Sequence, residues 1–122
     1  MAKFDFKNYR FEDLEVWKLG MQIVHEVYKL VKKFPRDEIF SLVDQLKRAA
    51  ISIVLNIAEG SGKSTDKELI RYFDIALGSL NEVLAACDVM KDNNLITEDE
   101  FQNVFKKVEN ISKQLGGFKK RL

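Results

Sequence analysis

Several residue types that build chemical sites are scarce in this chain of 122 residues. Cys87 is the single cysteine, so no internal disulfide can form, and we expect a cytoplasmic location. His25 is the single histidine and Gln22 stands three residues before it, so the paired Glu-x-x-His motifs of di-iron bundles are missing. The sequence therefore predicts no metal, no cofactor and no enzymatic activity. A Cys87–His25 nucleophilic pair stays open, although the spacing of Cys87 indicates a small buried hydrophobe without basic neighbours.

Long apolar stretches and a strong net charge are also missing. No apolar run exceeds five residues, which excludes a membrane-spanning helix, and residues 1–16 are too charged for a signal region. The net charge is only +1, so composition alone does not indicate a nucleic-acid partner. Residues 101–122 are locally basic, as a solvated helix end or a phosphate-contacting segment would be.

Helical periodicity is abundant instead. Apolar residues recur at alternating steps of three and four, which predicts helices at about 14–33, 41–59, 66–91 and 98–120 in one domain, 1–122. Pro35 ends the first, and Thr65 and Thr97 each begin a capping-box pattern. Short connections favour antiparallel neighbours, so the predicted fold is all-α, an antiparallel up-down four-helix bundle preceded by an N-terminal arm, 1–12.

The stretch EGSGKST, residues 59–65, resembles the end of a phosphate-binding P-loop. The full motif requires glycine at the position of Ile57, and it follows a β-strand, whereas a helix is predicted here. We therefore interpret the stretch as a helix-joining turn in which Gly60 and Gly62 supply the turn.

The second predicted helix is apolar on two sides. The core stripe includes Leu46, Ala50 and Ile53, and a second apolar side points away from it. Either this helix is deeply buried in its own bundle, or the second side is a subunit interface, which we favour. The predicted interface residues are Ile51, Val54, Leu55 and Ala58.

A polar stripe runs between these two sides, made of Gln45, Arg48, Ser52, Asn56 and Glu59. For Ser52 and Asn56 we favour hydrogen bonds that set helix register. For Arg48 a structural and a ligand-binding role both stay open. A turn near residue 63 would place Arg48 level with Gly78, within one turn of Asp74 and Glu82.

The third helix has a second stripe of its own, in which Gly78 and Ala85 would let another helix approach closely. Aromatic residues precede the first helix, and we expect them to tie the arm onto the bundle or a neighbour rather than to stack on bases. These aromatic residues are Phe4, Phe6, Tyr9 and Phe11.

Three segments resemble the 23S rRNA intervening-sequence protein family, namely FEDLEVWKLG (11–20), QLKRAAISIVLNIAEGSGK (45–63) and YFDIALGSLNEV (72–83). The resemblance extends over most of the chain, from about residue 9 to residue 118. The accessory protein of diversity-generating retroelements is similar. The resemblance implies a homopentameric barrel with a basic channel that binds RNA or DNA, without catalysis. Positions that match polar family positions are Arg48, Asn56, Glu59, Arg71 and Glu82.

Two functions follow as hypotheses. The first is a non-enzymatic homo-oligomer, pentamer favoured, that binds RNA or DNA electrostatically and without sequence preference. The second is a protein–protein adaptor that does not bind nucleic acid. Convergence of the cations on one surface would favour the first, and neutralisation by neighbouring acids the second. The candidate nucleic-acid-binding residues are Lys47, Arg48, Lys63, Lys67 and Arg71.

Overall fold

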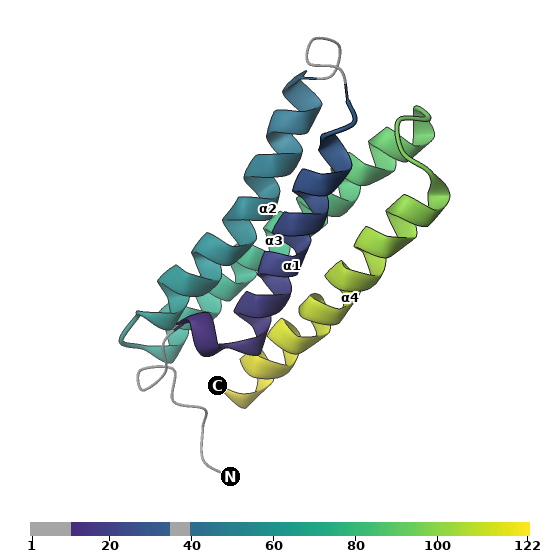
Figure 1. The fold of residues 1–122 in the computed structure, drawn as a ribbon. Helices are drawn as coiled ribbons and strands as arrows, with labels where there is room; N and C mark the ends of the chain where they lie inside the picture. The colour runs from purple at the N-terminus through teal and green to yellow at the C-terminus, as the bar shows by residue number, and fades with distance from the viewer. Residues whose placement is uncertain (1–10, 35–39) are drawn as a thin grey trace.

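The computed structural model describes residues 11–34 and 40–122, and Figure 1 shows their arrangement. A short 3-10 turn, η2 (Phe11–Asp13), precedes four α-helices. They are α1 (Glu15–Val31), α2 (Phe40–Ser61), α3 (Asp66–Asp92) and α4 (Glu98–Arg121). The described residues contain no β-strand. The predicted all-α fold is confirmed, whereas most of the arm and Pro35 lie outside the described residues.

Successive helices run in opposite directions, and each contacts the next, while α4 returns to contact α1 (Figure 1). The α2–α3 turn and the C-terminus lie at one end of the bundle, and the α3–α4 turn lies at the other (Figure 1). This is the predicted up-down four-helix bundle. The main differences in length are in α1, which ends at Val31 rather than near residue 33, and in α2, which ends at Ser61 rather than near residue 59.

The predicted core stripes form the interior. Phe73, Ile23, Leu46, Ile111 and Leu115 are among the largest side chains that are fully buried. Because one stripe from each helix points inward, a single apolar core holds the bundle together. No helix of the described part is both long and apolar enough to cross a membrane.

Side-chain caps begin α3 and α4 as predicted. Thr97 accepts a hydrogen bond from the backbone N–H of Glu100, and the Glu100 carboxylate accepts one from the Thr97 N–H, which completes a capping box. The Thr65 hydroxyl accepts a hydrogen bond from the Glu68 N–H. The Glu68 carboxylate lies 3.4 Å from Arg71 instead of completing a second box.

Two glycines allow helices to approach closely, and one of them corrects the interpretation of EGSGKST. A Cβ atom on Gly20 would lie 2.8 Å from Cγ1 of Val54. A Cβ atom on Gly60 would lie 2.9 Å from Cβ of Tyr72. Gly60 is buried inside α2, which continues to Ser61, so its role is close α2–α3 packing rather than the turn. Residues 62–65 form the connection, and a helix rather than a strand precedes it.

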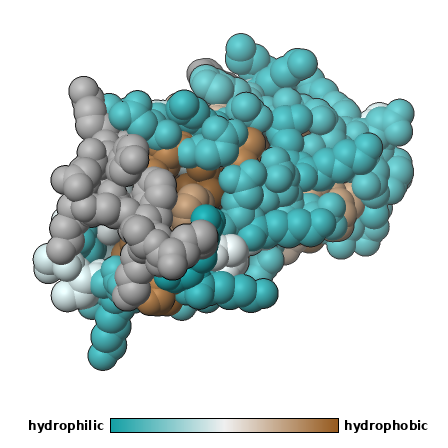
Figure 2. All heavy atoms as spheres, turned by 90° about the horizontal axis from the view of Figure 1, so that it is seen from below, coloured by the Kyte–Doolittle hydropathy of each residue, from teal (hydrophilic) through white to brown (hydrophobic). Residues whose placement is uncertain are grey.

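The surface is largely hydrophilic but not uniformly so. Seen from below, apolar side chains gather in the middle of the face that Figure 2 shows. Large apolar side chains that stay exposed include Phe40, Leu55, Ile75 and Val89. Exposed apolar groups that share one face usually mark a contact surface, so their distribution over the helices bears on function.

Candidate nucleic-acid and assembly interface

One hydrogen bond between hydroxyls crosses the α2–α3 pair, and a neighbouring amide supports it from within α2. The Ser79 hydroxyl donates to the Ser52 hydroxyl at 2.8 Å, across 27 residues of sequence. The Asn56 amide donates to the backbone carbonyl of Ser52 at 2.8 Å and to its hydroxyl at 3.0 Å. The predicted role in helix register is therefore confirmed for Ser52, while Asn56 supports Ser52 through hydrogen bonds within α2.

This register corrects the position predicted for Arg48. Ser52 lies opposite Ser79, so in an antiparallel pair Arg48 lies level with residue 83 rather than with Gly78. Its guanidinium pairs with Asp44 on the preceding turn of α2, with 2.9 Å between Nε and Oδ2. Asp74 pairs with Lys119 of α4 and not with Arg48. The prediction assumed too early a turn, because α2 extends two residues beyond its expected end.

The four predicted interface residues do not share one exposed side. Val54 is only 7% exposed and packs toward Gly20 of α1. Ile51 and Ala58 are half-buried, and Leu55 is 62% exposed. Val54 therefore belongs to the protomer interior, and Leu55 is the member that projects most into solvent.

A continuous exposed stripe instead follows the outer side of α3. Its members recur at steps of three and four, which places them on one helix face, and they are mostly apolar or small. Ile75 is 40% exposed and Val89 is 48% exposed. The full stripe is Arg71, Ile75, Gly78, Glu82, Ala85 and Val89.

An open groove lies between α2 and α3 beside this stripe, with a volume of about 450 Å³. Leu42, Ala85, Ala86 and Val89 make its lining largely apolar, whereas Gln45, Arg48 and Glu82 add polar groups. The groove thus combines apolar surface with one cation and one anion, a composition suited to a protein surface.

Tyr72 gathers two of the predicted nucleic-acid-binding residues at the α2–α3 end of the bundle. Lys63 Nζ lies 5.2 Å from the centroid of the Tyr72 ring, and the Arg71 guanidinium carbon lies 5.5 Å from the same centroid. Lys67 follows in the first turn of α3. A hydrogen bond from Lys63 to Glu59, and then the nearby Tyr72, raise the pKa of Lys63.

The other two candidate cations lie away from this group. Lys47 Nζ lies 5.1 Å from the centroid of the Tyr28 ring. Measured along the axis of α2, Lys47 is about 20 Å from the C-terminal end of that helix. Arg48 is the next residue of α2 and lines the α2–α3 groove. The five cations therefore form two groups in the protomer rather than one surface. Three of them also face acids on their own helix or turn, namely Arg48 with Asp44, Lys63 with Glu59 and Arg71 with Glu68.

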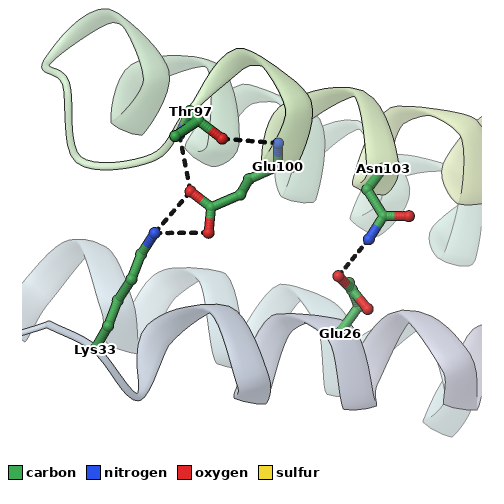
Figure 3. Close-up of polar contacts among 5 residues, drawn as sticks. All are labelled: Glu26, Lys33, Thr97, Glu100 and Asn103. Atoms are coloured by element: carbon green, nitrogen blue, oxygen red, sulfur yellow. Dashed lines mark hydrogen bonds and ion pairs between the residues drawn. The ribbon is translucent and has the colours of Figure 1, made fainter.

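The α1–α4 contact is held by a different kind of polar group, which Figure 3 shows. Lys33 Nζ lies 2.6 Å from both carboxylate oxygens of Glu100. Asn103 of α4 donates a hydrogen bond to Glu26 of α1. The ammonium of Lys33 and the Thr97 N–H lower the pKa of Glu100. These exposed polar groups join the two helices that are farthest apart in the sequence.

The single cysteine and the single histidine do not form a catalytic pair. Cys87 is fully buried, and burial raises the pKa of its thiol to about 12. His25 is exposed on α1. Among residues 11–34 and 40–122, no three His, Cys, Asp or Glu side chains gather as a metal site would require. The prediction that Cys87 is a buried hydrophobe is confirmed.

Sequence reasoning missed two contributors to these surfaces. Tyr72 was absent from the candidate set, although its position between Arg71 and the core residue Phe73 is a recognisable signal for a boundary aromatic residue. Val89 was also missed. Continuing the stripe of Arg71, Ile75, Gly78, Glu82 and Ala85 by one further step of four would have found it.

Two comparisons relate the chain to known proteins. The family model described as 23S rRNA-intervening sequence protein matches residues 12–117. One solved structure aligns with a TM-score of 0.77 and 20% sequence identity. The alignment covers 86% of this chain and 98% of the other chain. This solved structure is a crystal structure of a protein with unknown function from the S23 ribosomal protein family of Bacteroides thetaiotaomicron, and at this identity the likeness shows the fold alone. No curated protein matches the chain.

Proposed function

The chain belongs to the 23S rRNA-intervening sequence protein family, and from that premise we propose that it is a non-enzymatic, self-associating protein that contacts nucleic acid through phosphate charge. The observation that carries the proposal is the exposed apolar stripe of α3 beside the α2–α3 groove. Self-association would remove the apolar members of that stripe, such as Ile75 and Val89, from water, and burial of apolar surface is the dominant favourable term in most protein associations. The resemblance favours a pentamer.

Support for the nucleic-acid contact comes from the group around Tyr72. Lys63, Lys67 and Arg71 lie at one end of the bundle, where Tyr72 holds two of them. Their ion pairs with Glu59 and Glu68 are solvent-exposed. Exposed pairs contribute about 0–1 kcal/mol, so a phosphate can replace the carboxylate at little cost. Repetition of this group in an assembly would multiply a weak contact, because several copies engage one polymer.

Binding assays over a range of salt concentrations test the nucleic-acid contact. We expect Lys67→Ala and Arg71→Ala to weaken binding to structured RNA and to duplex DNA equally, because phosphate contacts carry no base information. Each removed contact should reduce the salt slope by about one. Lys47→Ala is the matched control, since it removes the same charge from the other group. If the intact assembly does not bind RNA or DNA at about 50 mM salt, the nucleic-acid part of the proposal is wrong.

Assembly is tested separately. Leu55→Glu should lower the mass of the assembly in light scattering on a size-exclusion column, because it places a charge on an exposed apolar position. Phe105→Glu, at an exposed position on α4, is the matched control and should leave the mass unchanged. A wild-type chain that is monomeric at micromolar concentration contradicts self-association.

One observation favours a second candidate, an adaptor that binds another protein and not nucleic acid. Three of the five candidate cations already face acids, and the cations form two separate groups in the protomer. An adaptor would use the apolar groove for a partner and would be insensitive to phosphate competitors. The same salt titration distinguishes the candidates, since an adaptor shows no binding to either polymer at low salt.

A further inference from the structure

We propose that the α2–α3 groove holds a helix of a second copy of this chain, with Arg48 of one copy facing Glu82 of the other. This inference rests on the self-association proposed above and names the surface and the charge pair that produce it. It corrects in part the side of α2 predicted from the sequence, since Val54 of that side is buried within the protomer while Leu55 stays exposed.

The first support is Gly78, a glycine with no role inside the protomer. A Cβ atom built on Gly78 has nothing within 4 Å, whereas one on Gly60 would collide with Tyr72. A glycine inside a helix destabilises it by about 1 kcal/mol relative to alanine. Internal packing offsets that loss at Gly60 but not at Gly78. Close approach of an outside helix to the bare backbone would offset it at Gly78.

The second support is the apolar surface on both sides of Gly78. Ile75 and Val89 of α3 remain 40% and 48% exposed, and Leu42 and Ala86 line the adjoining groove. Gly78 and Ala85 are small, so the stripe is low on either side of Glu82. Two shallow positions that flank one carboxylate, with Ile75 and Val89 beyond them, fit the ridge of a helix that carries a cation.

Charge identifies the occupant. Arg48 and Glu82 line the same groove with opposite signs, and both are exposed. Arg48 has an exposed partner in Asp44, while no ion pair to Glu82 occurs within the described ranges. Nucleic acid would be repelled by Glu82 and Asp44. A second copy of the chain carries the same Arg48 and Glu82. In a closed symmetric assembly, each of these charges can therefore lie opposite a charge of the other sign on the neighbouring copy.

Charge reversal tests the pair between copies. Arg48→Glu and Glu82→Arg each place like charges at the contact, so each variant alone should associate about tenfold more weakly than the wild type. Mixing the two variants restores opposite charges only if the pair forms between copies. Light scattering and sedimentation of the mixture should therefore show recovery of mass. A pair formed within one chain would leave the mixture as weak as its components.

Gly78 provides a second measurement that does not depend on charge. Gly78→Leu fills one of the two shallow positions and should lower the assembly mass, while Gly78→Ala has a smaller effect. Circular dichroism should show the same helix content in both, because the added side chain meets no protomer atom at Cβ. Gly116→Leu on α4, where a Cβ atom also meets nothing within 4 Å, is the matched control.

The outcomes separate this inference from the proposed function. A monomeric wild type overturns both. A wild-type assembly that survives Gly78→Leu and both charge reversals overturns the groove contact and leaves self-association standing. If each charge-reversal variant associates weakly and their mixture does not regain the assembly mass, the Arg48–Glu82 pair between copies is overturned.

Discussion

The α2–α3 pair and the α1–α4 pair are joined in different ways. Between α2 and α3, Gly60 lies against Tyr72 and the Ser52 and Ser79 hydroxyls meet, all without charge. Between α1 and α4, the cross-helix contacts that Figure 3 shows are exposed and involve the carboxylates of Glu26 and Glu100. The first pair depends on shape and the second adds charge to its apolar core.

This difference predicts different responses to perturbation. Close packing and uncharged hydrogen bonds are insensitive to salt, whereas exposed ion pairs are screened by it and change with pH. Changes in the α2–α3 contact should therefore have large effects that are independent of solution conditions. Changes in the α1–α4 contact should have small effects that depend on them.

The largest effect is expected for Gly60→Ala. The new Cβ atom would lie 2.9 Å from Cβ of Tyr72, so α2 and α3 must move apart. Overpacking of this kind lowers the free energy of unfolding by about 1–3 kcal/mol. Gly62→Ala is the control, since its Cβ atom would lie at an ordinary 3.7 Å from the Glu59 carbonyl oxygen. Urea unfolding checks both, and equal midpoints would contradict the close α2–α3 contact.

A moderate effect is expected for Ser79→Ala and Ser52→Ala. Each removes the hydrogen bond between the two hydroxyls, which should lower the free energy of unfolding by about 1 kcal/mol. The double variant should lose less than the sum of the single losses, because the two residues share that bond. Additive losses in urea unfolding, or a loss that disappears in high salt, would show that the bond does not join the helices.

The smallest effect is expected for Glu100→Gln, and it should depend on pH. Lys33 and the Thr97 N–H lower the pKa of Glu100 below its unfolded value of about 4.3. The stability that results is present above that unfolded pKa and is lost as the pH falls through the lower folded pKa. Gln still completes a capping box, so the variant removes the charge and retains the cap.

Urea unfolding between pH 7 and pH 3 measures this contribution. The wild type should lose a few tenths of a kcal/mol more than Glu100→Gln over that range, because the pair is exposed and screened. High salt should reduce the difference. Parallel pH profiles for the two proteins would contradict a charged contact between α1 and α4.

The sequence by itself determined the four helices, their core stripes and their caps. Each depends on interactions within a few residues, such as the spacing of Leu69, Phe73 and Ala76 or the hydroxyl of Thr97. The role of Ser52 and Asn56 was also predictable. Two small polar residues one turn apart on an apolar helix need partners close by.

Only the tertiary structure decided which side of each helix faces which neighbour. Val54 was assigned to an outer surface, but Gly20 lets α1 approach α2 closely enough to cover it. Arg48 was predicted to lie level with Gly78 of α3 but lies level with residue 83, and Lys33 meets Glu100 across 67 residues. Helix rotation and register depend on how two surfaces interlock. A shift of one residue turns a side chain by about 100°, which a periodic pattern along one helix does not determine.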